Sequence, residues 1–420
     1  MAILDNTQAV AVQIEKVRKA LRPLFERCDT TISLLKQKGS VEKVSSRAMR
    51  IPIEIAPPGN FSLVNLDSNV TGLGRGSGTQ YTYATVSPLD WAVACEATKK
   101  AEISTNSAEK AIADVVRKDM KNGVKEMNWA LDALLQTPGT GQIGVASTIS
   151  GTTWTMGGNF KTLLFHRGMQ VELYDSTFAT KRVGVATVVT VDYENSQITV
   201  DALPVGGVSG DLVVHKGLSG ANPTSLFGIP YFQTNASSGT TLGLNRANYP
   251  EIRAMGVAAG STFLSPSMVR AALNKLRIKR DDDAIMAGLL VHTSPVQTDA
   301  YEQNAQLISR IDKTSSAKES FDLFFTPSNM AGVPVKTNIK ADPTRIDFLC
   351  LDRWGLAVSQ DIDFYRDPGN GETVFPLYDT TTGARVPAAI WYIIFSGQVF
   401  SDDPGAGAYI SGLSKPSLYP

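Results

Sequence analysis

The chain has 420 residues, of which 43% are hydrophobic and 19% charged, which is typical of a chain that buries a core and excludes a wholly disordered protein. Lysine plus arginine and aspartate plus glutamate number 40 each, so the net charge is zero, which argues against a protein that coats nucleic acid through a basic excess. Cys28, Cys95 and Cys350 are odd in number and widely spaced, which indicates a reducing compartment without a disulfide framework. No apolar run reaches membrane-spanning length, and acidic residues interrupt the N-terminal segment where a secretory signal would be apolar.

The N-terminal segment is predicted to be an amphipathic arm. Its apolar residues recur at helical spacing, with Pro23 interrupting the pattern, at Val10, Ile14, Val17, Leu21 and Leu24. A second short helix is predicted over Thr30–Gln37, ended by Gly39. Because this arm precedes any predicted core, its apolar face needs a partner in its own subunit or in a neighbour. Removing Met1–Lys38 is expected to leave soluble subunits that do not assemble.

A long hairpin follows the arm. Apolar and polar residues alternate over Met49–Ile55, and Thr79–Val86 has the composition of the return strand. The glycines of Gly72–Gly78 superficially resemble a phosphate-binding loop, but no buried strand precedes them and no helix follows, so a hairpin tip is favoured. An isolated two-stranded hairpin is marginal in water, so this one is expected to lie on another surface.

One long helix is predicted over Ser104–Leu135. Apolar residues recur along it at steps of three and four, Asn106 and Glu109 form a capping-box-like start, and Pro138–Gly139 ends it. Its other face is predicted to be polar and carries Lys110, Asp114, Arg117, Lys118, Lys121, Lys125 and Asp132. Taken alone, this pattern indicates only a helix with one buried face.

The composition changes after Gly151. As far as about Gln233 the chain is rich in Thr, Val and Gly, and short strands separated by turn residues indicate a small antiparallel barrel or sandwich inserted in the host fold. The predicted strands are Gln170–Tyr174, Gly184–Asp192, Gln197–Val200 and Asp211–Val214.

Helices and strands are mixed from Asn245 onward. Helices are predicted from Ser265 or Pro266 and from Pro295 to about Ile311. Strands are predicted over Leu289–Val291, Phe321–Phe325, Val333–Lys336, Ile346–Leu351 and Ala388–Phe400. Because no repeated βαβ units occur, the fold class is predicted to be α+β rather than a doubly wound sheet.

The sequence carries no enzyme signature. His166, His215 and His292 have no second ligand at metal-binding spacing, and no cysteine has a nearby histidine that would activate it as a nucleophile. The carboxylates of Asp281–Asp283 are expected to form a solvated loop rather than a cation site. We therefore predict no catalytic residue, no metal site and no cofactor.

Short motifs mark the joints between these parts. They are Arg50-Ile51-Pro52 at the start of the hairpin, Thr137–Gly141 after the long helix, Leu226–Ile229 and then Leu244–Arg246 after the insertion, Phe348–Trp354, and Phe400–Pro404. Each motif is degenerate alone, but in this order nearly the whole chain resembles the major capsid proteins of tailed bacteriophages, which have the Hong Kong 97-type shell fold.

The resemblance implies a division of the chain into named parts. They are an N-terminal arm (1–45), an E-loop hairpin (46–92), a spine helix and peripheral domain (93–150), a β-rich insertion (151–235), an axial domain (236–345), and a return to the peripheral domain with a C-terminal strand (346–420).

The resemblance also implies a function. The chain is expected to be a non-enzymatic coat protein that self-assembles into pentamers and hexamers of an icosahedral or prolate phage head around double-stranded DNA. It would be assembled in the host cytoplasm and reside in the virion. It would contact DNA without sequence specificity, and it would contact no membrane. Further expected partners are separate scaffolding and portal proteins, with decoration proteins as an additional candidate.

Candidate interface residues lie in the two arms. They are Val10, Ile14, Val17 and Leu21 in the N-terminal arm and Arg75, Tyr81 and Tyr83 in the hairpin, with packing inside the subunit as the alternative for each. Two other functions stay open. One is an encapsulin-like compartment of the same fold, which the presence of the β-rich insertion makes less favoured than a phage coat protein. The other is a soluble enzyme or binding module that uses the insertion.

Two departures from the family limit what the resemblance implies. Some members cross-link subunits through a hairpin lysine, but Ile55–Val86 contains no lysine, so we expect no isopeptide cross-link from this hairpin. Some members carry a long cleaved scaffolding segment, for which the arm is too short, so a separate scaffold or none is expected. The Lys-rich face of the long helix is a candidate for the genome side.

Overall fold

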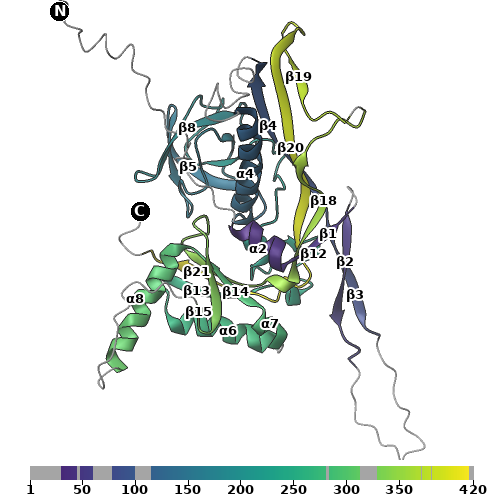
Figure 1. Ribbon diagram of the computed structural model, residues 1–420. Coiled ribbons are helices and arrows are strands. Elements are labelled where there is room, and N and C mark those ends of the chain that lie inside the picture. The colour runs from purple at the N-terminus through teal and green to yellow at the C-terminus, as the bar shows by residue number, and fades with distance from the viewer. Residues whose placement is uncertain are drawn as a thin grey trace, which may run out of the picture. The chain divides into compact units, whose positions relative to one another are not determined.

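The computed structural model describes residues 30–44, 48–59, 78–99, 115–280, 283–312, 329–369, 371–379 and 381–415 (Figure 1). These residues divide into two compact units. The first contains the described residues of 92–127 and 363–394, and the second those of 28–91, 128–362 and 395–420. None of the helices in these ranges combines the length and apolarity needed to cross a membrane.

The predicted hairpin is confirmed in the second unit. Strands β2 (Met49–Ala56) and β3 (Gln80–Val86) pair antiparallel, with Ile51 opposite Ala84, and they pair with no other described strand. Ala84 and Val86 are buried on one face while Tyr81 and Tyr83 are exposed on the other, as strand alternation requires. The predicted glycine-rich tip lies outside the described residues.

The second short helix is also confirmed, but it is not peripheral. Helix α2 (Thr30–Lys38) buries Ile32 and Leu35, and after Gly39 it leads into strand β1 (Ser40–Lys43), which pairs in parallel with the start of β18 (Trp354–Phe364). The last part of the predicted arm is therefore built into the second unit.

The long helix is present as α4 (Val115–Leu135), and its predicted start at Ser104 lies outside the described residues. Lys121 and Lys125 are exposed, as predicted for the polar face. The prediction for Asp132 is wrong: this residue is fully buried. Every residue from Leu131 to Thr137 is buried, so at its C-terminal end the helix has no solvent-exposed face for Asp132 to occupy.

The insertion is a closed antiparallel barrel, one of the two forms predicted, with strand order β10-β5-β6-β9-β8-β7 (Figure 1, teal). Its strands are β5 (Gln142–Ser150), β6 (Thr153–Gly157), β7 (Gln170–Tyr174), β8 (Ala186–Asp192), β9 (Gln197–Val200) and β10 (Asp211–His215). The barrel thus begins before Gly151, because β5 is needed to close it between β10 and β6. Trp154, Val171 and Leu173 fill its interior.

A six-stranded sheet forms the other core of the second unit, in the order β13-β21-β17-β14-β16-β15. The strands are β13 (Met255–Thr262), β14 (Leu289–Thr293), β15 (Asn329–Met330), β16 (Val333–Thr337), β17 (Arg345–Cys350) and β21 (Ala408–Leu413). Strand β17 lies between β14 and β21, so residues predicted to belong to two regions, 236–345 and 346–420, share one sheet.

Helices cover and extend this sheet. Helix α6 (Pro266–Lys279) begins at the N-cap Ser265 and packs on β13 and β21 through Val269 and Leu276. Helix α8 (Pro295–Asp312) begins at Pro295, as predicted, and the short helix α7 (Asp283–Ala287) precedes β14. The predicted strand Phe321–Phe325 lies outside the described residues.

The long strand β20 (Arg385–Ser401) lies in the first unit as far as Ile394, and there it pairs with β19 (Phe375–Tyr378). Strand β4 (Leu89–Thr98) also pairs with β20. Short elements complete the chain: α5 (Ile229–Phe232), β11 (Thr240–Thr241), β12 (Leu244–Asn245), and 3-10 turns at Pro250–Ile252 and Leu351–Arg353. The mixture of separate sheets and helices confirms the predicted α+β class.

Candidate functional site

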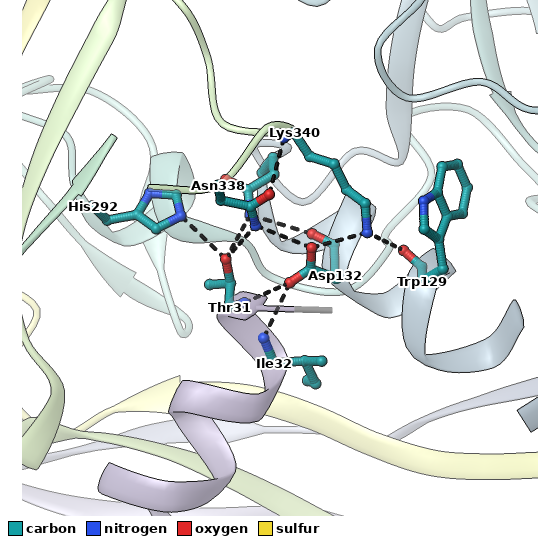
Figure 2. A network of polar contacts seen from close by, with 8 residues as sticks. Thr31, Ile32, Trp129, Asp132, His292, Asn338 and Lys340 are labelled. Atoms are coloured by element: carbon teal, nitrogen blue, oxygen red, sulfur yellow. Dashed lines mark hydrogen bonds and ion pairs between the residues drawn. The ribbon is translucent and has the colours of Figure 1, made fainter. Parts of the chain in front are cut away.

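A buried polar network holds the first turn of α2 in place (Figure 2). It joins Thr31 and Ile32 of α2 to Asp132 of α4, His292 of β14, and the turn after β16 that carries Asn338 and Lys340. All of these residues belong to the second unit. We call this network the α2 anchor.

Asp132 caps α2 from a different helix. Its Oδ1 accepts the backbone N–H of Thr31 at 2.8 Å and that of Ile32 at 3.1 Å. These N–H groups lie in the first turn of α2, where no intrahelical acceptor exists. In most helices a side chain directly before the first turn supplies this cap. Because a helix as short as α2 is marginal alone, its formation depends on docking to α4.

The charge of Asp132 is paired with Lys340. The Lys340 Nζ donates to Asp132 Oδ2 at 2.9 Å and to the carbonyl of Trp129 at 3.2 Å, and it lies 4.8 Å from the centre of the Trp129 ring. The two charged side chains are 2% and 0% exposed. Asn338 Nδ2 also donates to Oδ2, at 3.0 Å. Each carboxylate oxygen therefore accepts two hydrogen bonds, which offsets the cost of burying the charge.

The Thr31 hydroxyl determines the tautomer of His292. Its Oγ1 accepts hydrogen bonds from Asn338 Nδ2 at 2.7 Å and Gln136 Nε2 at 3.2 Å. The hydroxyl hydrogen is therefore left to donate to His292 Nε2, 3.1 Å away. Burial lowers the pKa of His292, outweighing the carboxylates of Asp347 and Asp132, which raise it. His292 is thus neutral, with its proton on Nδ1.

A second histidine, in the barrel, predicts a measurable pH dependence. Burial, and secondarily His166, lower the pKa of His215 to about 4, and the His215 Nε2 has no hydrogen-bond partner among the described residues. In the unfolded chain His215 binds a proton near pH 6.5, whereas in the folded chain it stays neutral until the pH falls toward 4. The contribution of neutral His215 to the free energy of unfolding is therefore complete above pH 6.5 and is lost as the pH falls toward 4. Between pH 7.5 and 5.0 we expect His215 to account for a loss of about 2 kcal/mol in the free energy of unfolding.

Urea unfolding at the two pH values measures this loss. Because the pKa of His292 is also lowered in the folded protein, the loss of stability in the wild type contains contributions from both histidines. Comparison with the variant His215→Gln isolates the contribution of His215. The pH-dependent loss in this variant should be about 2 kcal/mol smaller than that of the wild type. An equal loss in both proteins would contradict the assignment to His215.

The α2 anchor is suited to holding a chain segment rather than to chemistry. In the described part of the chain, no group of three or more His, Cys, Asp or Glu side chains could hold a metal ion. The cavity beside the anchor has a volume of about 10 Å³ and is lined mainly by apolar side chains, including Leu35, Leu135 and Trp354. That volume is no more than one water molecule requires, so the anchor offers no ligand pocket.

The predicted interface residues are elsewhere. Tyr81 and Tyr83 are 69% and 54% exposed on one face of β3, and the Arg50 guanidinium lies 4.8 Å from the Tyr83 ring centre. The base of the hairpin is tied down where Thr85 N donates to Leu242 O at 3.0 Å. The other candidates, Val10, Ile14, Val17, Leu21 and Arg75, lie outside the described residues. The interface role of all seven remains a prediction.

Sequence reasoning missed every member of the α2 anchor. One signal was available: Asp132 interrupts the apolar run Leu131–Leu135, and a carboxylate in such a run must find partners if it is buried. Lys340 gave no signal, because its neighbours Ile339 and Ala341 form no periodic pattern with it.

No protein-family model matches the chain, and no curated protein matches it. Solved structures do match over the whole chain. The capsid asymmetric unit of cyanophage A-1(L) contains a chain that is 14% identical, with a TM-score of 0.59, covering 98% of this chain and 100% of that one. The capsid of an empty GTA particle matches at 11% identity and a TM-score of 0.50, covering 99% of each chain.

An encapsulin complex from Synechococcus elongatus PCC 7942 is also similar, at 9% identity and a TM-score of 0.46, covering 100% of this chain and 99% of that one. At such identities structural likeness establishes the fold and nothing further. The chain has the fold of phage capsid proteins, which confirms the fold that the order of its sequence elements predicts.

Proposed function

We propose that this chain, which has the fold of phage capsid proteins, is the coat subunit of a phage head. Copies of it would self-assemble into pentamers and hexamers and enclose double-stranded DNA. The observation that carries the proposal is the coverage of the match, 98% of this chain and 100% of the cyanophage capsid chain. Hairpin, long helix, barrel and sheets are therefore all accounted for by one shell-forming architecture.

The hairpin supports self-association. It has no core of its own, and it presents two exposed tyrosines on one face. Tyrosine is enriched among residues that dominate binding energy at protein interfaces. Many such contacts of modest strength, repeated over a closed shell, give a container that dissociates slowly. The net charge of zero means that little general repulsion opposes close packing of copies.

The α2 anchor gives the N-terminal arm a defined point of departure. Because Asp132 accepts hydrogen bonds from Thr31 N and Ile32 N, the first turn of α2 is held at a defined place in the second unit. An amphipathic segment that starts from a fixed point reaches the same site on each neighbour, which a closed repetitive assembly requires.

Contact with DNA would be non-specific. Lys121 and Lys125 are exposed on α4, and lysines that neutralise phosphates bind DNA irrespective of its sequence. This face of α4 is the candidate for the genome side. Scaffolding, portal and decoration proteins, assembly in the host cytoplasm and residence in the virion belong to the same proposal.

Light scattering after size-exclusion chromatography tests self-association of the purified full-length chain. We expect capsomers or larger shells. In the double variant Tyr81→Ser/Tyr83→Ser, the protein concentration needed for assembly should rise by about tenfold or more. Tyr378→Ser is the matched control, because Tyr378 is 56% exposed but lies on β19, and it should assemble as the wild type does.

The result separates the alternatives. A discrete small oligomer at all concentrations would exclude a shell subunit and favour a soluble enzyme or binding module. If shells form, nucleic acid in native particles identifies a phage head, and a protein cargo identifies an encapsulin-like compartment.

A further inference from the structure

His292 lies beneath α2 on one face of the six-stranded sheet. Side chains alternate between the two faces of a strand, and on β14 Leu289 and Val291 belong to the core that packs against α6. Leu290 and His292 therefore point to the opposite face, where they line one small cavity together with Thr31 of α2. His292 is buried in this position, so lifting α2 from the sheet would open its ring to water.

The docked helix leaves no acceptor for a second proton on His292. The Thr31 hydroxyl donates to His292 Nε2 at 3.1 Å (Figure 2). Its oxygen already accepts hydrogen bonds from Asn338 Nδ2 and Gln136 Nε2, so both of its lone pairs are used. A proton on Nε2 would place a donor against an oxygen that can accept no further hydrogen bond. Docking of α2 and protonation of His292 therefore oppose each other.

The charged groups around His292 do not compensate for a positive charge in the docked state. Helix α2 carries only two lysines, both in its last turn. The charged groups on the other elements packed around His292 are Asp132 of α4, Lys336 of β16, Lys340 of the turn after β16, and Asp347 and Arg345 of β17. Both carboxylates are already paired, Asp132 with Lys340 at 2.9 Å and Asp347 with Arg345 at 2.6 Å. An imidazolium would therefore be buried without a counter-charge of its own.

We propose that the α2 anchor is an acid-sensitive latch, in which protonation of His292 keeps α2 released once the helix has lifted from the sheet. Lifting removes the Thr31 hydroxyl from Nε2, and the ring takes up a proton from water. The imidazolium cannot re-form the docked arrangement, so acid shifts the equilibrium toward the released helix. The N-terminal arm then loses its fixed attachment. The latch lies within one subunit and does not depend on the proposed shell function.

Hydrogen–deuterium exchange of the full-length, unassembled protein tests the latch. A solvated histidine binds a proton near pH 6.5, whereas docked His292 stays neutral. Opening of α2 should therefore be about tenfold more frequent at pH 5.5 than at pH 7.5. Mass spectrometry of the peptide that contains α2 measures this increase, after correction for the pH dependence of exchange in unprotected amides. Peptides from β14 and β17 should retain more of their protection than α2 does, because the sheet stays folded.

Two variants assign the effect to one histidine. His292→Gln keeps an acceptor for the Thr31 hydroxyl but takes up no proton, so its α2 should exchange at the same corrected rate at both pH values. His215→Gln is the matched control, because it removes a buried histidine of the barrel and should keep the tenfold response.

Three outcomes would overturn the latch. They are a wild-type α2 whose corrected exchange does not change with pH, a tenfold response that persists in His292→Gln, and an equal loss of protection in α2, β14 and β17, which would show that the whole sheet opens. If His292→Gln does not fold, the comparison of α2 with the two strands in the wild type still decides. A wild-type chain that never assembles would overturn the shell function and leave the latch standing.

Discussion

Replacing Lys340 by methionine is expected to lower the free energy of unfolding by about 3–5 kcal/mol, because it leaves the buried carboxylate of Asp132 without its counter-charge. Asp132 is 0% exposed and Lys340 2% exposed, so water cannot replace the lost ammonium group. Equilibrium urea unfolding of unassembled protein at low concentration measures the change. Intrinsic fluorescence follows the transition, and Trp129, whose ring lies beside the ammonium group, is one of the five tryptophans that contribute to it.

Two further variants make that measurement decisive. In Asp132→Asn/Lys340→Met both charges are absent, so this double variant should be more stable than Lys340→Met alone. Lys336→Met removes an exposed lysine of the neighbouring strand β16 and should change the free energy of unfolding by less than about 0.5 kcal/mol. If Lys340→Met stays within about 1 kcal/mol of the wild type, the buried pair is not the centre of the anchor.

The second large effect is a contrast between two N-terminal deletions. Deleting Met1–Asp29 leaves α2 intact and is expected to give a folded subunit that does not assemble. Deleting Met1–Lys38 also removes the buried side chains of Ile32 and Leu35 and the two N–H donors to Asp132. Apolar losses of this size cost about 2–5 kcal/mol each, so the longer deletion should consume most of the stability of the fold. This revises the expectation from the sequence that deleting Met1–Lys38 leaves soluble subunits, because α2 is part of the folded second unit.

Circular dichroism melting and size-exclusion chromatography of the two deletions provide the readout. The shorter deletion should melt at nearly the wild-type temperature and elute as a small species. Normal assembly of that variant would contradict a role for the arm between copies. A longer deletion that remains as stable as the wild type would contradict the anchor.

Local patterns predicted the elements whose determinants are local. The ending of α2 at Gly39, the start of α6 at Ser265 and the alternation in β2 were all visible in the sequence, because each depends on residues a few positions apart. Strand β5, Gln142–Ser150, was missed. It follows a turn-rich segment, its composition is mixed, and its place in the barrel is determined by pairing with β10, more than sixty residues away.

The α2 anchor could not be predicted for a related reason. Periodicity assigns a residue to the apolar or polar face of a helix, and on that basis Asp132 was assigned to solvent. Its burial follows from three segments that meet around it, from α2, α4 and the turn at Asn338–Lys340. A short window of sequence contains no information about which distant segments will contact it. The exposure of Tyr81 and Tyr83, by contrast, follows from the alternation of side chains between the two faces of strand β3.

Electron microscopy of the purified full-length chain tests the central claim, self-assembly into a shell, most directly. Negative-stain images should show closed shells or rings with fivefold and sixfold symmetry at concentrations where light scattering detects assembly. Uniform small particles without ring symmetry, from protein whose melting curve shows that it is folded, would contradict the claim.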